Sequence, residues 1–121
     1  MKAYVVEKEA LSHNIELLQK MANGVPIWAV LKGNGYGIGV LPLARHLAEA
    51  GIDHFCVTEV REAELLRENG FEDASILMLR STGDPAELNR LMDLRVILTI
   101  GSWVIHAKCL NNRCNSENFS L

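Results

Sequence analysis

The sequence lacks the signals that mark a membrane or secreted protein. No apolar run approaches the roughly 18 residues that are needed to span a bilayer. The start of the chain, Met1 to Glu9, is polar and charged rather than a basic segment followed by an apolar run. Three cysteines in 121 residues are an odd count and too few for a disulfide scaffold. We therefore expect a cytoplasmic protein with reduced thiols and no membrane partner.

The sequence also lacks a block of like charge. Its formal net charge of -3 comes from 15 acidic and 12 basic residues spread along the chain. A nucleic-acid-binding surface needs clustered Lys and Arg to follow the phosphates, so nucleic acid is not an expected partner. Hydrophobic residues, by contrast, make up 49% of the chain, which is enough to bury the core of one domain.

Short β-branched runs alternate with amphipathic stretches through the middle of the chain. A leading helix is expected over residues 10–22, and four strands with helices between them follow. The strands are expected at residues 27–31, 55–58, 76–79 and 96–100, and the helices at residues 41–50, 60–69 and from the N-cap Asp84 through Met92. Beyond Ser102, residues 103–121 form an unpatterned tail in which no strand is expected.

This alternation predicts an α/β fold with a parallel sheet that is buried on both faces. Four strands are about half of a closed eight-stranded barrel, which takes roughly 250 residues. Two interpretations stay open at this point: a small open sheet that folds alone, or the first half of a barrel. Half a barrel would expose the hydrogen-bonding edges of its outer strands, so architecture alone favours the open sheet.

The most informative segment is residues 29–39, AVLKGNGYGIG. Lys32 lies at the carboxyl end of an apolar strand, which is where sites form in parallel α/β proteins. If neighbouring strands partly desolvate it, its amine can attack an aldehyde cofactor. The commoner alternative is that Lys32 extends into water without a chemical role, and that the glycines only permit a tight turn.

Two other glycine-rich motifs do not fit this segment. The dinucleotide-binding fingerprint needs a third glycine where the frame from Gly33 has Ile38 and the frame from Gly35 has Val40. A Walker-type phosphate loop places its lysine after the glycines, whereas Lys32 precedes them. Neither motif is assigned.

The segment resembles the cofactor signature of alanine racemases, in which a strand ends in Ala-Val-hydrophobic-Lys-Ala-Asn-Ala-Tyr-Gly-His-Gly. Lys32 and Tyr36 agree outright, while Gly33 and Gly35 replace the usual alanines and Ile38 replaces the usual histidine. Residues 11–15 and 55–63 are also similar to the family, and the resemblance extends from about Tyr4 to Ser102. It implies the first half of a TIM-type (β/α)8 barrel over residues 1–102.

The resemblance implies an alanine racemase, which interconverts L-alanine and D-alanine with pyridoxal 5'-phosphate and supplies D-alanine for the cell wall. Lys32 would hold the cofactor and act as one acid/base, and Tyr36 would contact the cofactor phosphate. Members of the family are homodimers, and their second base is a tyrosine from the carboxyl-terminal domain of the partner subunit. We expect this domain to be missing from the chain. Racemisation is therefore expected to be weak or absent. The alternative hypothesis is a truncated, non-catalytic remnant that binds pyridoxal phosphate weakly or not at all.

Other polar residues are assigned no catalytic role. His106, Cys109 and Cys114 lack a matching second pair for a metal site, so no metal is expected. His13 and His46 fall within expected helices and are interpreted as surface or packing residues.

Four charged residues near strand ends are also left out of the site. Glu59, Arg61 and Glu62 are interpreted as the solvated face of a helix. Arg80 follows the third strand and could meet a phosphate or a carboxylate, but solvation at the surface is the simpler interpretation.

Overall fold

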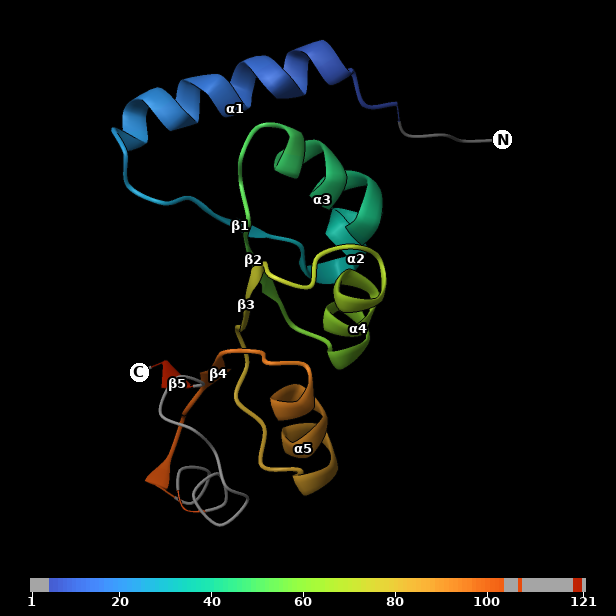
Figure 1. Ribbon diagram of the computed structural model, residues 1–121, viewed down its shortest axis with the longest axis vertical. Coiled ribbons are helices and arrows are strands. Elements are labelled where there is room, and N and C mark those ends of the chain that lie inside the picture. The colour runs from blue at the N-terminus through green and yellow to red at the C-terminus, as the bar shows by residue number, and fades with distance from the viewer. Residues whose placement is uncertain (1–4, 104–106, 108–118, 121) are drawn as a thin grey trace.

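The computed structural model describes residues 5–103, 107, 119 and 120 (Figure 1). The predicted helices and strands occur in the predicted order through residue 93, with the short element α2 in the expected glycine-rich turn. The elements are α1 (Lys8–Ala22), β1 (Trp28–Val30), α2 (Lys32–Tyr36), α3 (Val40–Glu49), β2 (His54–Val57), α4 (Val60–Glu68), β3 (Ser75–Met78), α5 (Pro85–Asp93), β4 (Leu98–Thr99) and β5 (Phe119–Ser120).

The first three strands form a parallel sheet in chain order. Ala29 of β1 pairs with Phe55 of β2, and Phe55 pairs with Ile76 of β3. Parallel neighbours joined by a helix are the arrangement that alternating strand and helix patterns predict. The carboxyl ends of β1, β2 and β3 consequently meet at one edge of the sheet.

The fourth strand is shorter than predicted. Ile97 forms only an isolated parallel bridge with Leu77, and regular strand structure is confined to β4. The Thr99 hydroxyl, rather than a backbone N–H, donates to the carbonyl oxygen of Met78 at 2.6 Å, so regular pairing with β3 does not continue. β4 instead pairs with β5, in parallel. The prediction of no strand after Ser102 is therefore wrong, because a two-residue strand is too short to produce a sequence period.

The two faces of the sheet differ in their covering. Figure 1 shows α3, α4 and α5 on the same side of the strands. The residues that pack toward these helices are fully or almost fully buried: Phe55, Val57, Ile76 and Met78. On the other face Trp28 is 39% exposed and His54, Ser75 and Leu77 are partly exposed. Among the described residues of this face, Cys56 is buried at 4% exposure, but the prediction of a sheet buried on both faces fails for the others.

Helix α1 packs beside α3 with only part of the apolar stripe that the sequence predicts, since Ile15 is buried at 3% exposure. The Ser12 hydroxyl lies 3.0 Å from His46 Nε2, and Gln19 donates a 2.7 Å hydrogen bond to the carbonyl oxygen of Ala50. These contacts orient the helix so that Leu18 and Met21, both predicted to be in the apolar stripe, are 54% and 81% exposed. His46, interpreted from the sequence as a surface or packing residue, is partly buried against α1.

Candidate active site at the carboxyl edge of the sheet

Lys32 follows β1 after one intervening residue, at the carboxyl edge of the sheet. The preceding residue, Leu31, is fully buried and donates its backbone N–H to the carbonyl oxygen of Cys56 at 2.8 Å. This bond extends the pairing of β1 with β2 up to Lys32. The Lys32 side chain itself is exposed, so the predicted partial desolvation is not found. The physical reason is that, among the described strands, β1 has a neighbour on one side only.

The chain then makes a turn of left-handed helix. Gly33, Asn34, Gly35 and Tyr36 have φ angles between 54° and 65°, in the left-handed region. The turn is closed by backbone hydrogen bonds from Gly35 N–H to the Leu31 carbonyl oxygen (2.7 Å) and from Gly37 N–H to the Gly33 carbonyl oxygen (3.1 Å). Glycine adopts these angles without a steric penalty, and asparagine tolerates them better than most residues. Tyr36, a residue for which these angles are unfavourable, is strained in this turn and is 63% exposed.

Glu62, in the first turn of α4, forms a hydrogen bond with the backbone of this left-handed turn. One carboxylate oxygen, Oε2, accepts the backbone N–H of Asn34 at 3.0 Å. The other, Oε1, accepts the backbone N–H groups of Thr58 and Glu59, each at 3.1 Å. The side chains of Glu59 and Arg61 are 64% and 63% exposed, as predicted, but Glu62 is only 6% exposed. Its assignment to the solvated face is therefore wrong.

Of the contacts that Glu62 makes, only those at the start of α4 can be recognised from the sequence. Glu59 and Glu62 form a capping box at the amino end of α4, in which each side chain accepts a backbone N–H of the other. The spacing of the two glutamates is that of the capping-box motif. No local pattern, however, reveals the contact between Glu62 and Asn34, which are 28 residues apart.

Asn34 is also bonded on its other sides. Its side-chain Oδ1 accepts the backbone N–H of Val40 at 3.3 Å, at the start of α3. Its carbonyl oxygen accepts the N–H of Gly39 at 2.8 Å. Three groups of Asn34 thus join the Lys32 turn to α3 and α4.

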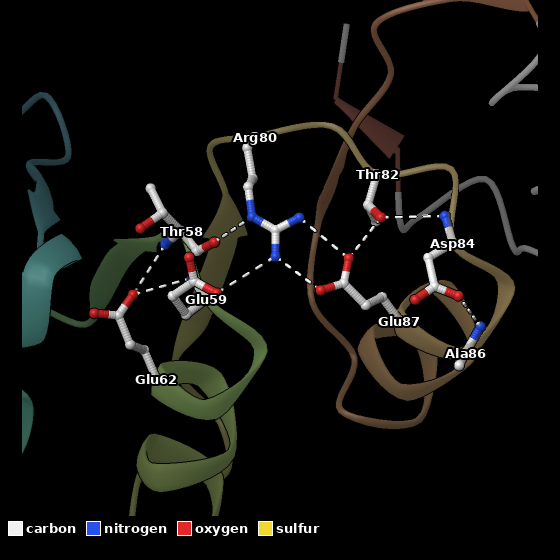
Figure 2. Close-up of polar contacts among 8 residues, drawn as sticks. All are labelled: Thr58, Glu59, Glu62, Arg80, Thr82, Asp84, Ala86 and Glu87. Carbon is white, nitrogen blue, oxygen red and sulfur yellow. Dashed lines mark hydrogen bonds and ion pairs between the residues drawn. The ribbon is translucent and has the colours of Figure 1, made fainter.

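Arg80 is bound between β2 and α5 rather than solvated (Figure 2). Its Nε donates to the carbonyl oxygen of Thr58 at 2.6 Å, and its two terminal nitrogens bind both carboxylate oxygens of Glu87 at 2.9 and 3.1 Å. Thr82 donates its hydroxyl to the same carboxylate at 2.6 Å. The hydrogen bonds from Arg80 and Thr82 lower the pKa of Glu87 to about 2. The charge of Arg80 is thus paired with that of Glu87, and its side chain connects the end of β2 to α5.

Thr58 joins the two networks, since its N–H donates to Glu62 and its carbonyl oxygen accepts from Arg80 (Figure 2). A continuous chain of polar contacts therefore runs along the carboxyl edge, from the Lys32 turn to the loop after β3. Tyr36 follows Lys32 on the same turn. His13 lies exposed on α1 and takes no part, as predicted.

Other kinds of site find little support in the described part of the chain. No group of three or more His, Cys, Asp or Glu side chains there is placed to hold a metal ion. His106, Cys109 and Cys114 lie outside the described residues. Burial raises the pKa of the Cys56 thiol.

A hollow of about 370 Å³ lies at the amino edge of the sheet, opposite to Lys32, and is lined in part by Gln19 and His54. No helix among the described residues is both long and apolar enough to cross a membrane.

Residues 6–117 match the family described as alanine racemase, N-terminal domain. The chain belongs to this family. An alanine racemase from Listeria monocytogenes is 44% identical over 78 residues, which cover 64% of this chain and 21% of that protein. One from Limosilactobacillus fermentum is 40% identical over 100 residues, which cover 81% of this chain and 26% of that protein. The chain therefore spans about a fifth to a quarter of the length of the curated relatives it matches.

Solved alanine racemase structures share the fold. The biosynthetic alanine racemase of Pseudomonas aeruginosa superimposes with a TM-score of 0.79 and 28% identity, over 89% of this chain and 30% of that one. The predicted fold, the first part of an alanine racemase barrel, is thereby confirmed. The small open sheet, which the argument from exposed strand edges favoured, is wrong, because the described residues superimpose on part of an alanine racemase structure. The family match also continues past Ser102, where the sequence pattern ends.

Proposed function

We propose that this chain is the cofactor-holding first part of an alanine racemase, in which Lys32 binds pyridoxal 5'-phosphate covalently. The observation that carries the proposal is a primary amine at the carboxyl end of the first strand, presented by a fixed left-handed turn. Membership of the alanine racemase N-terminal family supports the assignment. Alanine is the proposed substrate and D-alanine for the cell wall the proposed product. The cytoplasmic location stays a prediction.

The residues present fit this cofactor. Lys32 offers an exposed primary amine for the aldehyde group, and Tyr36 an exposed hydroxyl that can donate to a phosphate oxygen. A Cβ atom built on Gly33 or Gly37 would meet no other atom within 4 Å, so the turn has open space around it. When bound, the cofactor supplies an electron sink for the negative charge that develops at the α-carbon of the amino acid.

The residues of this chain would provide an acid/base on one face of the substrate only. The Lys32 amine would take a proton from the α-carbon or return one to it on a single face of the substrate. Inverting the α-carbon requires a second acid/base on the opposite face. The family supplies this group from the carboxyl-terminal domain of a partner subunit in a homodimer, which lies outside this chain. We therefore propose cofactor binding for this chain and racemisation only for a complete assembly.

The proposal is tested by locating the covalent bond. The 121-residue chain is incubated with pyridoxal 5'-phosphate, treated with borohydride, digested and mapped by mass spectrometry. We expect the pyridoxyl group on Lys32 in the unmutated chain and its loss in Lys32→Arg, which keeps the charge but has no primary amine. Lys20→Arg is the matched control, because Lys20 is an exposed lysine in the last turn of α1.

Two outcomes would contradict the proposal. The first is the absence of an adduct on Lys32 in the unmutated chain, and the second is equal modification of Lys20 and Lys32. Either would support the alternative function, a truncated remnant that does not bind the cofactor specifically. That alternative is favoured by the exposure of Lys32, since surface lysines in general react alike.

A further inference from the structure

We propose that Glu62 is a positioning residue for Lys32, acting through the backbone of the left-handed turn. This inference rests on the proposed function of Lys32 and adds a residue that lies 30 positions further along the chain. Glu62 does not contact the Lys32 amine. Its carboxylate instead binds the N–H of Asn34, two residues after Lys32, and so determines where the turn lies relative to β2 and α4.

The burial and bonding of Glu62 distinguish it from the other acidic residues. It is the one buried charged residue among the described residues, at 6% exposure. A buried carboxylate is tolerated only when hydrogen bonds replace the water that it loses. Here three backbone N–H groups do so, at 3.0, 3.1 and 3.1 Å. Two of them belong to the β2–α4 connection and one to the Lys32 turn, so the carboxylate clamps the ends of two neighbouring strand connections.

The turn needs an anchor because its sequence is intrinsically flexible. Gly33 and Gly35 flank Asn34, and glycine has access to more backbone conformations than any other residue. Without the bond from Asn34 to Glu62, the backbone after Lys32 would keep its contacts to α3 but lose its contact to α4. The direction in which Lys32 leaves β1 would then vary, and fewer conformations would present its amine correctly to a bound aldehyde.

The competing explanation is that Glu62 only caps α4, as its bonds to Thr58 and Glu59 would by themselves suggest. Glu62→Gln separates the two roles, because an amide has one acceptor oxygen where the carboxylate has two. If that oxygen caps α4, the NH₂ group faces the Asn34 N–H and the anchor is lost. Asp84→Ala is the matched control: it removes the N-cap bond of α5 to Ala86, at 3.0 Å, and leaves the Lys32 turn untouched.

Two measurements are made on the full chain and on both variants. The first is the hydrogen exchange rate of the Asn34 amide by NMR, which needs no cofactor. The second is the rate at which pyridoxal 5'-phosphate modifies Lys32, measured relative to Lys20 by borohydride fixation and mass spectrometry. In Glu62→Gln we expect faster exchange at Asn34 and an about tenfold lower relative rate at Lys32, the size expected for loss of one hydrogen bond to a charged group. In Asp84→Ala both quantities should remain those of the unmutated chain.

Unchanged exchange and an unchanged relative rate in Glu62→Gln would overturn the proposal and leave Glu62 as a helix cap. Equal losses in Asp84→Ala would also overturn it, because general destabilisation would then be the cause. If Glu62→Gln does not fold, Glu62→Asp takes its place: it keeps a charge in the first turn of α4 but is too short to span both connections. Faster Asn34 exchange without any Lys32 adduct in the unmutated chain would refute the proposed function while supporting the anchoring role of Glu62.

Discussion

Gly33 and Gly35 stand where alanine racemases usually have alanine, and their backbone φ angles of 64° and 65° are unfavourable for a residue with a side chain. Their surroundings differ. A Cβ atom on Gly33 would meet nothing within 4 Å, whereas one on Gly35 would lie 3.3 Å from the backbone nitrogen of Val40. The same substitution at the two positions therefore separates conformational strain from crowding.

We expect Gly33→Ala to lower the free energy of unfolding by about 1 kcal/mol, the cost of left-handed backbone for alanine. Gly35→Ala should lower it by about 1 kcal/mol more, because Val40 and the start of α3 must shift to make room. Urea-induced unfolding followed by circular dichroism measures both. Equal effects at the two positions would mean that contact with Val40 has no energetic consequence.

At the scale of elements, the ion pair of Arg80 and Glu87 ties the loop after β3 to the first turn of α5 (Figure 2). Hydrogen bonds from Arg80 and Thr82 lower the pKa of Glu87 from its ordinary value of 4.5 to about 2. Since folding lowers this pKa, the pair stabilises the fold fully above a pH of about 4.5. The stabilisation is lost as the pH falls toward 2 and the carboxylate takes up a proton.

The pH dependence of stability should therefore weaken in Glu87→Gln. Both side chains are about one-third exposed, at 35% and 30%, so we expect a loss of only about 1 kcal/mol in the unmutated chain that the variant does not show. The measurement is the free energy of unfolding in urea at a pH of about 5 and of about 3. Glu16→Gln, on the exposed part of α1, is the control. Parallel pH profiles of the unmutated chain and Glu87→Gln would contradict the prediction.

At the scale of the whole molecule, the described residues have the fold of part of a barrel, with Lys32 at the carboxyl edge of the sheet. One face of the sheet is covered by α3, α4 and α5, and the other leaves Trp28 and His54 partly exposed. In a closed barrel this second face becomes the packed interior. The chain spans about a fifth to a quarter of the length of its curated relatives, and the part it shares with them includes the strand that precedes Lys32.

We expect the isolated chain to bind the cofactor without racemising alanine, because an acid/base is available on one face of the substrate only. Chiral chromatography of L-alanine after incubation with the cofactor-loaded chain measures the product. An intact alanine racemase serves as the positive control and Lys32→Arg as the negative one. Formation of D-alanine above the level of Lys32→Arg would show that this chain provides both groups.

The sequence alone determined the order of the elements through residue 93, the family, and the position of Lys32 and Tyr36 after the first strand. These features depend on local periodicity, on turn residues and on a contiguous motif, all of which act over a few neighbouring residues. Only the tertiary structure decided how much of the predicted apolar stripe of α1 packs, that one sheet face stays largely open, and that Glu62 and Arg80 are bound rather than solvated. Each of these two residues has one partner far along the chain, 28 residues away from Glu62 and 22 from Arg80. Such contacts form only when the strands bring their carboxyl ends together, so no local pattern records them.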